Sequence, residues 1–198
     1  FKRGEIFTGS ILMASIWGYS ANSGTAAKPI VFGAYGTGVK PVMQYPQGGT
    51  TTVTQRVVLW FVAVNYIVVD GLNFTDLVDT TNDKVSVANC GYAIYLGIPD
   101  EANTNYCTIK NIDVSLCGMG VAVTGDFNTI TNSTLTNFKN LINTNNGGVD
   151  DYGANAVTII GSDNTISNTG AAANAYEFTP HLPRQRTPGT HRAGSGVR

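Results

Sequence analysis

The segment that decides the fold is NYCTIKNIDV at residues 105–114, because three other segments of the chain line up with it. These are NYIVVDGLNF from Asn65, DFNTITNSTL from Asp126 and SDNTISN from Ser162. One column of the alignment is aliphatic and contains Val69, Ile109, Ile130 and Ile166. A second column, two places further on, contains Gly71, Asn111, Asn132 and Asn168. Such an internal repeat predicts a stack of similar units.

The spacing of the repeat indicates how the units are connected. Successive members of the aliphatic column are 40, 21 and 36 residues apart. A stacked solenoid accepts unequal spacing, because its strands keep register while the connections lengthen outward at little entropic cost. A second set of short apolar runs, each closed by glycine, comprises GYAIYLG from Gly91, GMGVAVTG from Gly118 and GANAVTIIG from Gly153. With a third short strand after the Asn bend, at 112–114, the order predicts three strands per coil of a parallel β-helix.

Alternation within each strand predicts which side chains face the core. The isoleucines of the aliphatic column point inward, and the flanking polar residues point outward; these are Thr108, Thr129, Thr165, Lys110, Thr131 and Ser167. Asparagine at the bend suits a left-handed residue, and its amide can hydrogen-bond to the same amide one coil away, at about 4.8 Å. We therefore predict an asparagine ladder of Asn111, Asn132 and Asn168, with Asn132 buried in it.

Composition limits the class of protein. The 42% hydrophobic content supports one domain with a core, and the high Gly, Asn and Thr content favours an all-β class. Only 13% of residues are charged and the net charge is −1, so a nucleic-acid partner is not expected. No apolar stretch approaches the roughly 18 to 20 residues that span a bilayer.

The three cysteines, Cys90, Cys107 and Cys117, form an odd set without the spacing of a zinc site. Buried thiols are the default interpretation. Cys90 and Cys117 each precede the glycine that opens the same type of strand, so the alternative is a pair stacked at disulfide range.

These features resemble the right-handed parallel β-helix superfamily that includes pectate lyase-like proteins. SGTAAKPIVFGAYGTGVKPV from Ser23 is similar to an entry segment of bacterial secreted β-helix proteins, and DDYGANAVTIIGSDNTISN from Asp150 to a later coil. The resemblance covers residues 1–178 and implies an all-β, right-handed solenoid with three short strands per coil, incomplete at both ends. Residues 179–198 lack alternation and acidic residues and contain four arginines, so we expect them to lie outside the stack, as a disordered or artefactual tail.

The resemblance also implies a function. It points to an extracellular or cell-surface protein that acts on polysaccharide, as a lyase of uronate-containing glycans or as a glycoside hydrolase. The alternative is a non-catalytic surface module that binds glycan or spaces other domains. In the lyases a cation such as Ca²⁺ neutralises the uronate carboxylate while Lys or Arg removes the C5 proton, and in the hydrolases paired carboxylates act as acid and base. Polysaccharide is the expected partner, Ca²⁺ the cofactor that this interpretation allows, and a monomer the expected state of the full-length protein.

The candidate site residues are few. Asp150 and Asp151 form the densest acidic spot, on a loop bounded by glycines, and are the candidate catalytic carboxylates or metal ligands, with Tyr152 as a substrate-binding residue. The alternative is a solvated turn. Lys110, on the outer face of its strand, is the candidate base; because it aligns with Asp70, the alternative is a surface ion pair worth about 0 to 1 kcal/mol.

Two further groups have open interpretations. Asp76, Asp79 and Asp83 have an oxygen-rich spacing that suits Ca²⁺, or else form a plain loop. Five aromatic residues are candidates for stacking on sugar rings; these are Trp17, Tyr19, Trp60, Tyr92 and Tyr95. Because Trp60 lies in the apolar run VVLWFVAV, we place it in the core.

Overall fold

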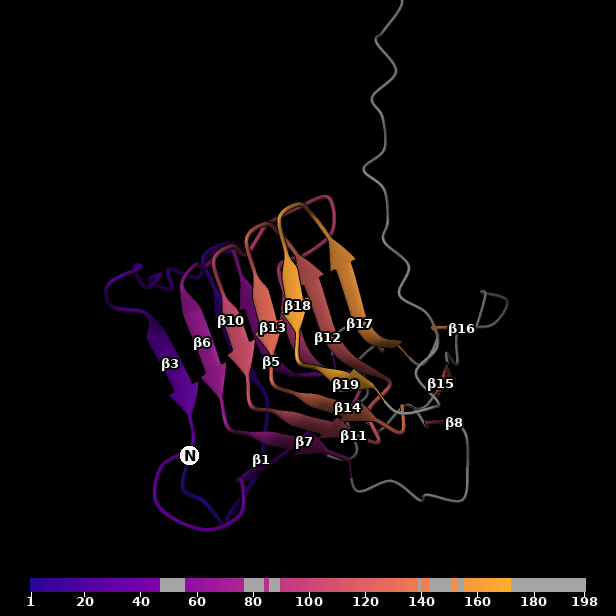
Figure 1. Cartoon of the computed structure of the whole chain (residues 1–198). Helices are drawn as coiled ribbons and strands as arrows, with labels where there is room; N and C mark the ends of the chain where they lie inside the picture. Colours follow the sequence, from indigo (N-terminus) through magenta and orange to yellow (C-terminus); the bar gives the residue numbers. More distant parts are fainter. Residues whose placement is uncertain are drawn as a thin grey trace, which may run out of the picture.

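In the computed structural model of the chain, successive coils stack to form three parallel sheets (Figure 1). The described residues are 1–46, 56–76, 84–85, 90–138, 140–142, 151–152 and 155–171. Sheet 1 contains β2 (Ile11–Ala14), β5 (Val57–Val62), β9 (Tyr92–Leu96), β12 (Met119–Thr124) and β17 (Asn155–Ile160). Sheet 2 contains β3 (Ile30–Gly33), β6 (Ile67–Asp70), β10 (Thr108–Lys110), β13 (Thr129–Thr131) and β18 (Thr165–Ser167). Sheet 3 contains β1 (Ile6–Thr8), β4 (Val42–Gln44), β7 (Asn73–Thr75), β11 (Asp113–Ser115), β14 (Thr134–Thr136) and β19 (Gly170–Ala171).

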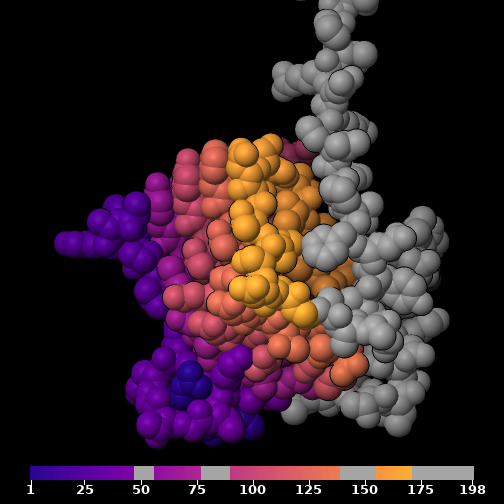
Figure 2. Space-filling view, in the orientation of Figure 1, coloured from indigo at the N-terminus to yellow at the C-terminus, as the bar shows by residue number. Residues whose placement is uncertain are grey.

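Each coil passes through sheet 1, sheet 2 and sheet 3 and then returns to sheet 1 one layer further along. One such coil runs from β9 through β10 and β11 to β12, which pairs in parallel with β9. Figure 2 shows the coils side by side in chain order, from indigo to yellow. The predicted all-β class and the three-strand parallel β-helix are confirmed.

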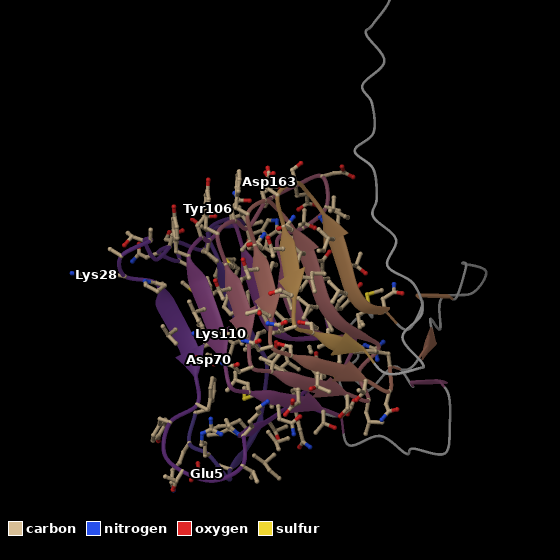
Figure 3. All side chains as sticks on the ribbon, in the orientation of Figure 1. Glu5, Lys28, Asp70, Tyr106, Lys110 and Asp163 are labelled. Atoms are coloured by element: carbon tan, nitrogen blue, oxygen red, sulfur yellow. The ribbon has the colours of Figure 1, made fainter. Side chains whose placement is uncertain are left out.

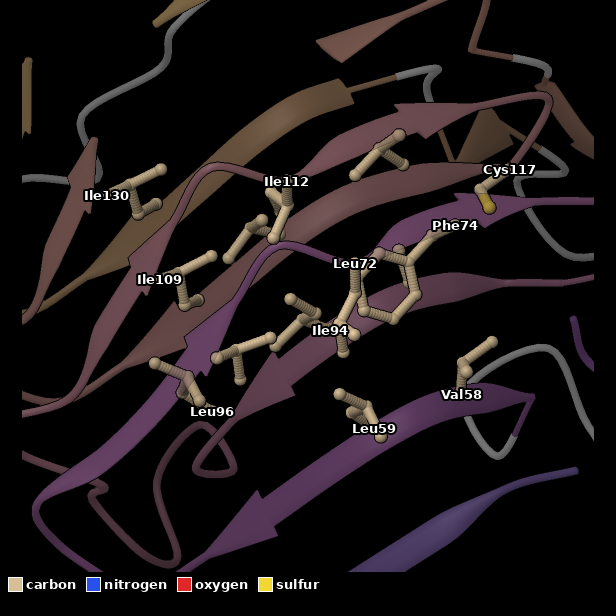
Figure 4. Packing of buried hydrophobic residues seen from close by; sticks show 14 of the residues in the cluster. Val58, Leu59, Leu72, Phe74, Ile94, Leu96, Ile109, Ile112, Cys117 and Ile130 are labelled. Atoms are coloured by element: carbon tan, nitrogen blue, oxygen red, sulfur yellow. The ribbon is translucent and has the colours of Figure 1, made fainter. Parts of the chain in front are cut away.

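The aliphatic column of the alignment is the inner face of sheet 2. Val69, Ile109, Ile130 and Ile166 are direct partners in successive strands, in the predicted order. The first three are about 1% exposed, and Ile166 packs against the same core. Figure 4 shows Ile109 and Ile130 side by side, with Ile94 and Leu96 of sheet 1 and Ile112 of the following bend filling the interior. The predicted inward direction of these isoleucines is therefore confirmed.

The bend between sheet 2 and sheet 3 is a single left-handed residue in each coil. The φ angles are +71° at Gly71, +54° at Asn111, +49° at Asn132 and +47° at Asn168, as the sequence predicts. The predicted burial of Asn132 is wrong, because this one-residue bend turns the side chain outward and leaves Asn132 and Asn168 exposed. Asn111 donates instead to Asp70 Oδ1 at 2.8 Å. The amide-to-amide ladder at this bend stays a prediction.

Coil-to-coil hydrogen bonds from side chains are found at the other bend, between sheet 1 and sheet 2. Asn65 Oδ1 accepts from Asn105 N at 2.9 Å, and Asn105 Oδ1 accepts from Asp126 N at 2.7 Å. Asp126 Oδ1 continues the column by accepting from Ser162 N at 2.7 Å. Each polar side chain therefore satisfies a backbone donor in the next coil.

Asn128 makes the most buried contacts of this type, since its side chain is only 2% exposed. Its Oδ1 accepts from Cys107 N at 2.9 Å, and its Nδ2 donates to Thr104 O at 3.0 Å. Asn128 thus satisfies two buried backbone groups that have no access to water.

The three cysteines are free, buried thiols, which confirms the default interpretation. Burial raises the pKa of Cys107 to about 11 and raises the pKa of Cys90 well above its ordinary value. Both groups are consequently protonated and unreactive at neutral pH.

Some predictions fall on residues outside the described ranges. These are the tail at 179–198 and the side chains of Asp79, Asp83 and Asp150. Within the described ranges no helix has the length and the apolar character that crossing a bilayer requires.

We predict that Ile130→Ala lowers the free energy of unfolding by about 2 to 5 kcal/mol, because it removes a fully buried side chain and leaves a cavity. Urea unfolding followed by circular dichroism measures the change. Thr165→Ala, at an exposed position of the neighbouring strand, is the control, and we expect it to cost less than about 1 kcal/mol. Equal losses in the two variants would contradict the inward assignment.

We also predict that Asn128→Ala lowers the free energy of unfolding by about 2 to 4 kcal/mol, because two buried backbone groups lose their partners. The same unfolding measurement applies, with Thr134→Ala on the exposed face of β14 as the control. A loss below about 1 kcal/mol would show that water replaces the amide at this bend.

Candidate functional site

Four aromatic side chains gather along the outer face of sheet 1, and we call them the aromatic strip: Trp17, Trp60, Tyr92 and Tyr95. Trp60 and Tyr95 are direct partners in β5 and β9, and their rings are nearly parallel, with centroids 5.9 Å apart. The Tyr92 and Tyr95 rings are also nearly parallel, at 4.9 Å. Trp17, which follows β2, meets Trp60 at 5.8 Å with an interplanar angle of 67°.

The strand pattern explains why these rings lie outside the coil. Leu59 and Phe61 point into the core on either side of Trp60, and Leu96 does the same after Tyr95. Alternation then turns Trp60 and Tyr95 outward, where they join a separate small cluster with Val57 and Tyr92. The predicted core position of Trp60 is therefore wrong: the run VVLWFVAV is apolar on both faces of its strand.

The members of the strip differ in exposure and in how firmly they are held. Trp17 is 53% exposed, Trp60 and Tyr95 are half-buried, and Tyr92 is buried. Trp60 Nε1 donates to Gly97 O at 3.4 Å, which fixes the indole, and burial raises the pKa of Tyr95 above its ordinary value. Trp17 consequently presents an exposed ring on a base of held aromatic side chains. Such an arrangement offers apolar ring surface to a ligand.

A small sheet lies where the chain passes from sheet 3 back to sheet 1. It contains β8 (Lys84–Val85), β15 (Asn140–Ile142) and β16 (Asp151–Tyr152). β8 comes from the connection between β7 and β9, and β15 and β16 come from the connection between β14 and β17. Two of the long connections thus pair with each other beside the start of the sheet 1 strands (Figure 1).

The residues predicted as acidic site and substrate-binding residue belong to this small sheet. Asp151 and Tyr152 form β16, which pairs antiparallel with Leu141 and Ile142 of β15. Asp150 lies outside the described residues, next to this strand. The roles of Asp150, Asp151 and Tyr152 in metal or substrate binding stay predictions.

Lys110 lies on a different surface, the outer face of sheet 2 next to the Asn111 bend. Its Nζ is 3.4 Å from Asp70 Oδ2, and both side chains are about one-third exposed. Figure 3 shows the two side by side, as the alignment of Lys110 with Asp70 predicts. Asp70 also accepts the hydrogen bond from Asn111, so this carboxylate holds two neighbours.

The structure does not bring Lys110 and Asp151 together. Lys110 precedes the bend at the start of β11, whereas β15 and β16 follow the far end of β14 (Figure 1). The width of sheet 3 therefore separates Lys110 from the backbone of β16. The assignment of Lys110 as the base stays a prediction.

Among the described residues no group of three or more His, Cys, Asp or Glu side chains has the arrangement of a metal site. Asp76, the first member of the predicted Ca²⁺ loop, is buried, and its Oδ2 accepts a hydrogen bond from Cys90 N. The Asp76 carboxylate thus accepts a backbone hydrogen bond from the segment that leads into β9. Binding of Ca²⁺ near Asp150 and Asp151 stays a prediction.

A second aromatic group was not anticipated from the sequence. Tyr66, Tyr106 and Phe127 stack at the bend between sheet 1 and sheet 2, with centroids 5.0 and 5.1 Å apart. They are the second residues of the aligned segments NYIVV, NYCTI and DFNTI, so an aromatic column in the alignment is the signal that identifies them.

Comparison with known proteins supports the fold. The structure is similar to the crystal structure of an alginate lyase from Paenibacillus sp. str. FPU-7, with a TM-score of 0.53 and 18% sequence identity. The similarity covers 88% of this chain and 50% of that chain, so the chain spans about half the length of the lyase. No protein-family model matches, and no curated protein matches. At 18% identity this similarity shows the right-handed parallel β-helix fold and does not assign an activity.

We predict that Lys110 and Asp70 form a weak ion pair. A double-mutant cycle with Lys110→Ala and Asp70→Ala should give a coupling energy of about 0 to 1 kcal/mol at low salt, falling as salt screens the pair. Urea unfolding at two salt concentrations measures it. Lys40 and Asp113, another ion pair at 2.9 Å, provide a matched cycle on sheet 3. A salt-independent coupling of several kcal/mol would contradict the surface assignment.

Proposed function

We propose that this protein binds a uronate-containing polysaccharide along the outer face of sheet 1 and acts on it as a lyase, outside the cell or at its surface. The observation that carries the proposal is the aromatic strip, in which Trp60 and Tyr95 repeat in register on adjacent coils. A linear sugar chain laid along the stack would meet this strip over several coils, spaced about 4.8 Å apart.

Trp17 supplies the contact surface in this proposal. Its indole is more than half exposed and lies across the edge of Trp60, which Gly97 holds by a hydrogen bond. A sugar ring that covers Trp17 buries apolar C–H groups on a ring that already packs against Trp60.

The acidic residues in the connection before β17 are the reason for proposing a uronate as the substrate. Asp150 and Asp151 lie in the connection that leads into β17, and the small sheet places part of it beside the start of the sheet 1 strands. Adjacent carboxylates recruit a divalent cation such as Ca²⁺, which in turn lets an anionic sugar approach them. The similar fold of an alginate lyase supports the same substrate class.

The elimination needs a base that takes the C5 proton while the C4–O bond breaks and a C4=C5 double bond forms. Lys110 is our candidate, and it acts only if the uronate chain extends from sheet 1 to the surface around Asp70. The ion pair with Asp70 favours a second candidate function, a non-catalytic glycan-binding module, because it gives the Lys110 side chain a structural partner on the surface.

The test is calorimetry and a lyase assay on alginate, polygalacturonate and chondroitin oligomers, with and without Ca²⁺. We expect Trp17→Ala to weaken binding about tenfold, by loss of the stacking contact. Tyr19→Ala is the matched control, since Tyr19 is 57% exposed in the same connection but makes no part of the strip. Unchanged affinity in the tryptophan variant would contradict binding on sheet 1.

Turnover is followed by the ultraviolet absorbance of the new double bond. We expect Asp150→Ala/Asp151→Ala to abolish the Ca²⁺-dependent part of binding, and Lys110→Ala to abolish turnover while binding persists. Binding without turnover in the wild type would support the non-catalytic module. Full turnover in the Lys110→Ala variant would show that Lys110 is not the base and that it only forms the ion pair with Asp70.

A further inference from the structure

Four residues occupy equivalent places at the bend between sheet 1 and sheet 2. The backbone N–H groups of Tyr66, Tyr106 and Phe127 donate to Asn105 O, Asp126 O and Ser162 O of the following coils, each at 3.2 Å. This register makes Asp163 the next member of the column after Phe127. All four residues are left-handed, with φ of +55°, +56°, +57° and +57° in chain order.

The backbone of this bend does not require aromatic side chains. A left-handed conformation strains bulky residues and suits Gly, Asn and Asp, whose short side chains tolerate it. Asp163 shows that the same turn accepts such a residue. The aromatic side chains at Tyr66, Tyr106 and Phe127 are therefore present despite the backbone preference, which indicates a role for their rings.

Among the described residues, Phe127 is the last ring of this stack. Tyr106 and Phe127 are 5.1 Å apart with planes only 3° from parallel, and they are 46% and 48% exposed. One face of Phe127 is covered by Tyr106. On the other side the column continues with Asp163, an exposed residue with a short side chain in place of a ring. Figure 3 shows Tyr106 and Asp163 along this same edge of the coils.

We propose that Phe127 and Asp163 form a binding site for a neutral pyranose, which stacks as the next layer of the column on the side of Phe127 that faces Asp163. Its C–H face lies on the ring, and its hydroxyl groups donate hydrogen bonds to the Asp163 carboxylate. An aromatic face beside a carboxylate combines apolar contact with charge-assisted hydrogen bonds. The existing layers, at 5.0 and 5.1 Å, show that this column accommodates flat rings one per coil.

The charge around the site selects against the uronate of the proposed function. Asp126 and Asp163 both lie at this bend, and the Asp126 carboxylate is held here by its hydrogen bond from Ser162 N. An anionic sugar would be repelled by both carboxylates. Trp17 follows β2 at one end of sheet 1, whereas Asp163 precedes β18 at the other end of sheet 2, so the two surfaces are separate.

Saturation-transfer NMR and calorimetry on the full chain test the proposal, with cellotetraose and mannotetraose as neutral probes and tetragalacturonate as the anionic probe. We expect saturation transfer from aromatic protons to a neutral probe. Phe127→Leu keeps an apolar side chain but removes the ring face, and Asp163→Gly keeps a residue suited to positive φ but removes the carboxylate. We expect each to weaken neutral-probe binding about tenfold.

Tyr66→Leu, at the far end of the stack, is the matched control and should leave binding of the neutral probes unchanged. Thermal unfolding confirms that each variant is folded, and Asp163→Gly gives a valid result even if Phe127→Leu destabilises the stack. Absence of transfer to both neutral probes would overturn the proposal, as would equal binding of tetragalacturonate at this site. Competition by a simple alkylammonium ion would instead assign the site to cations. Loss of uronate binding in Trp17→Ala leaves this proposal intact, so the two proposals fail independently.

Discussion

The parallel hydrogen-bond register between successive coils is the constraint on which the rest of the structure depends. It holds equivalent residues about 4.8 Å apart, so each position of a coil lies next to the same position of the coils above and below it. Ile109 therefore contacts Val69 and Ile130, and Lys110 lies beside Asp70. The residue at one position of a coil therefore favours a similar or complementary residue at the same position of the next coil.

The two bends use this register in different ways. At the bend after sheet 2 a single left-handed residue turns the chain into sheet 3, and its side chain points to solvent, as at Asn132. At the bend after sheet 1 the turn is wider, and Asn105 and Asn128 reach the backbone of neighbouring coils. Polar side chains are therefore most important for stability where the chain leaves backbone groups without strand partners.

The outer surfaces are where coils of the same plan acquire different chemistry. Sheet 1 is apolar on both faces around Trp60, sheet 2 carries hydroxyl groups and the Lys110–Asp70 pair, and the bend between them carries the Tyr106–Phe127 stack. The long connections from sheet 3 to sheet 1 leave the repeat altogether and form β8, β15 and β16. Connections of this kind can differ in length at little entropic cost while the strands keep register.

The sequence alone determined the repeat, the inward isoleucines and the left-handed bend residues, because strand alternation and the register are local and recur in every coil. It also predicted the pairing of Lys110 with Asp70, which follows directly from the alignment. Only the tertiary structure decided that Trp60 lies outside the core, that Asn132 is exposed, and that sheet 3 separates Lys110 from Asp151. These outcomes depend on which face of an apolar strand meets the interior and on how three sheets are arranged around it. Neither property is encoded in the spacing of residues along the chain, because both arise when distant coils pack together.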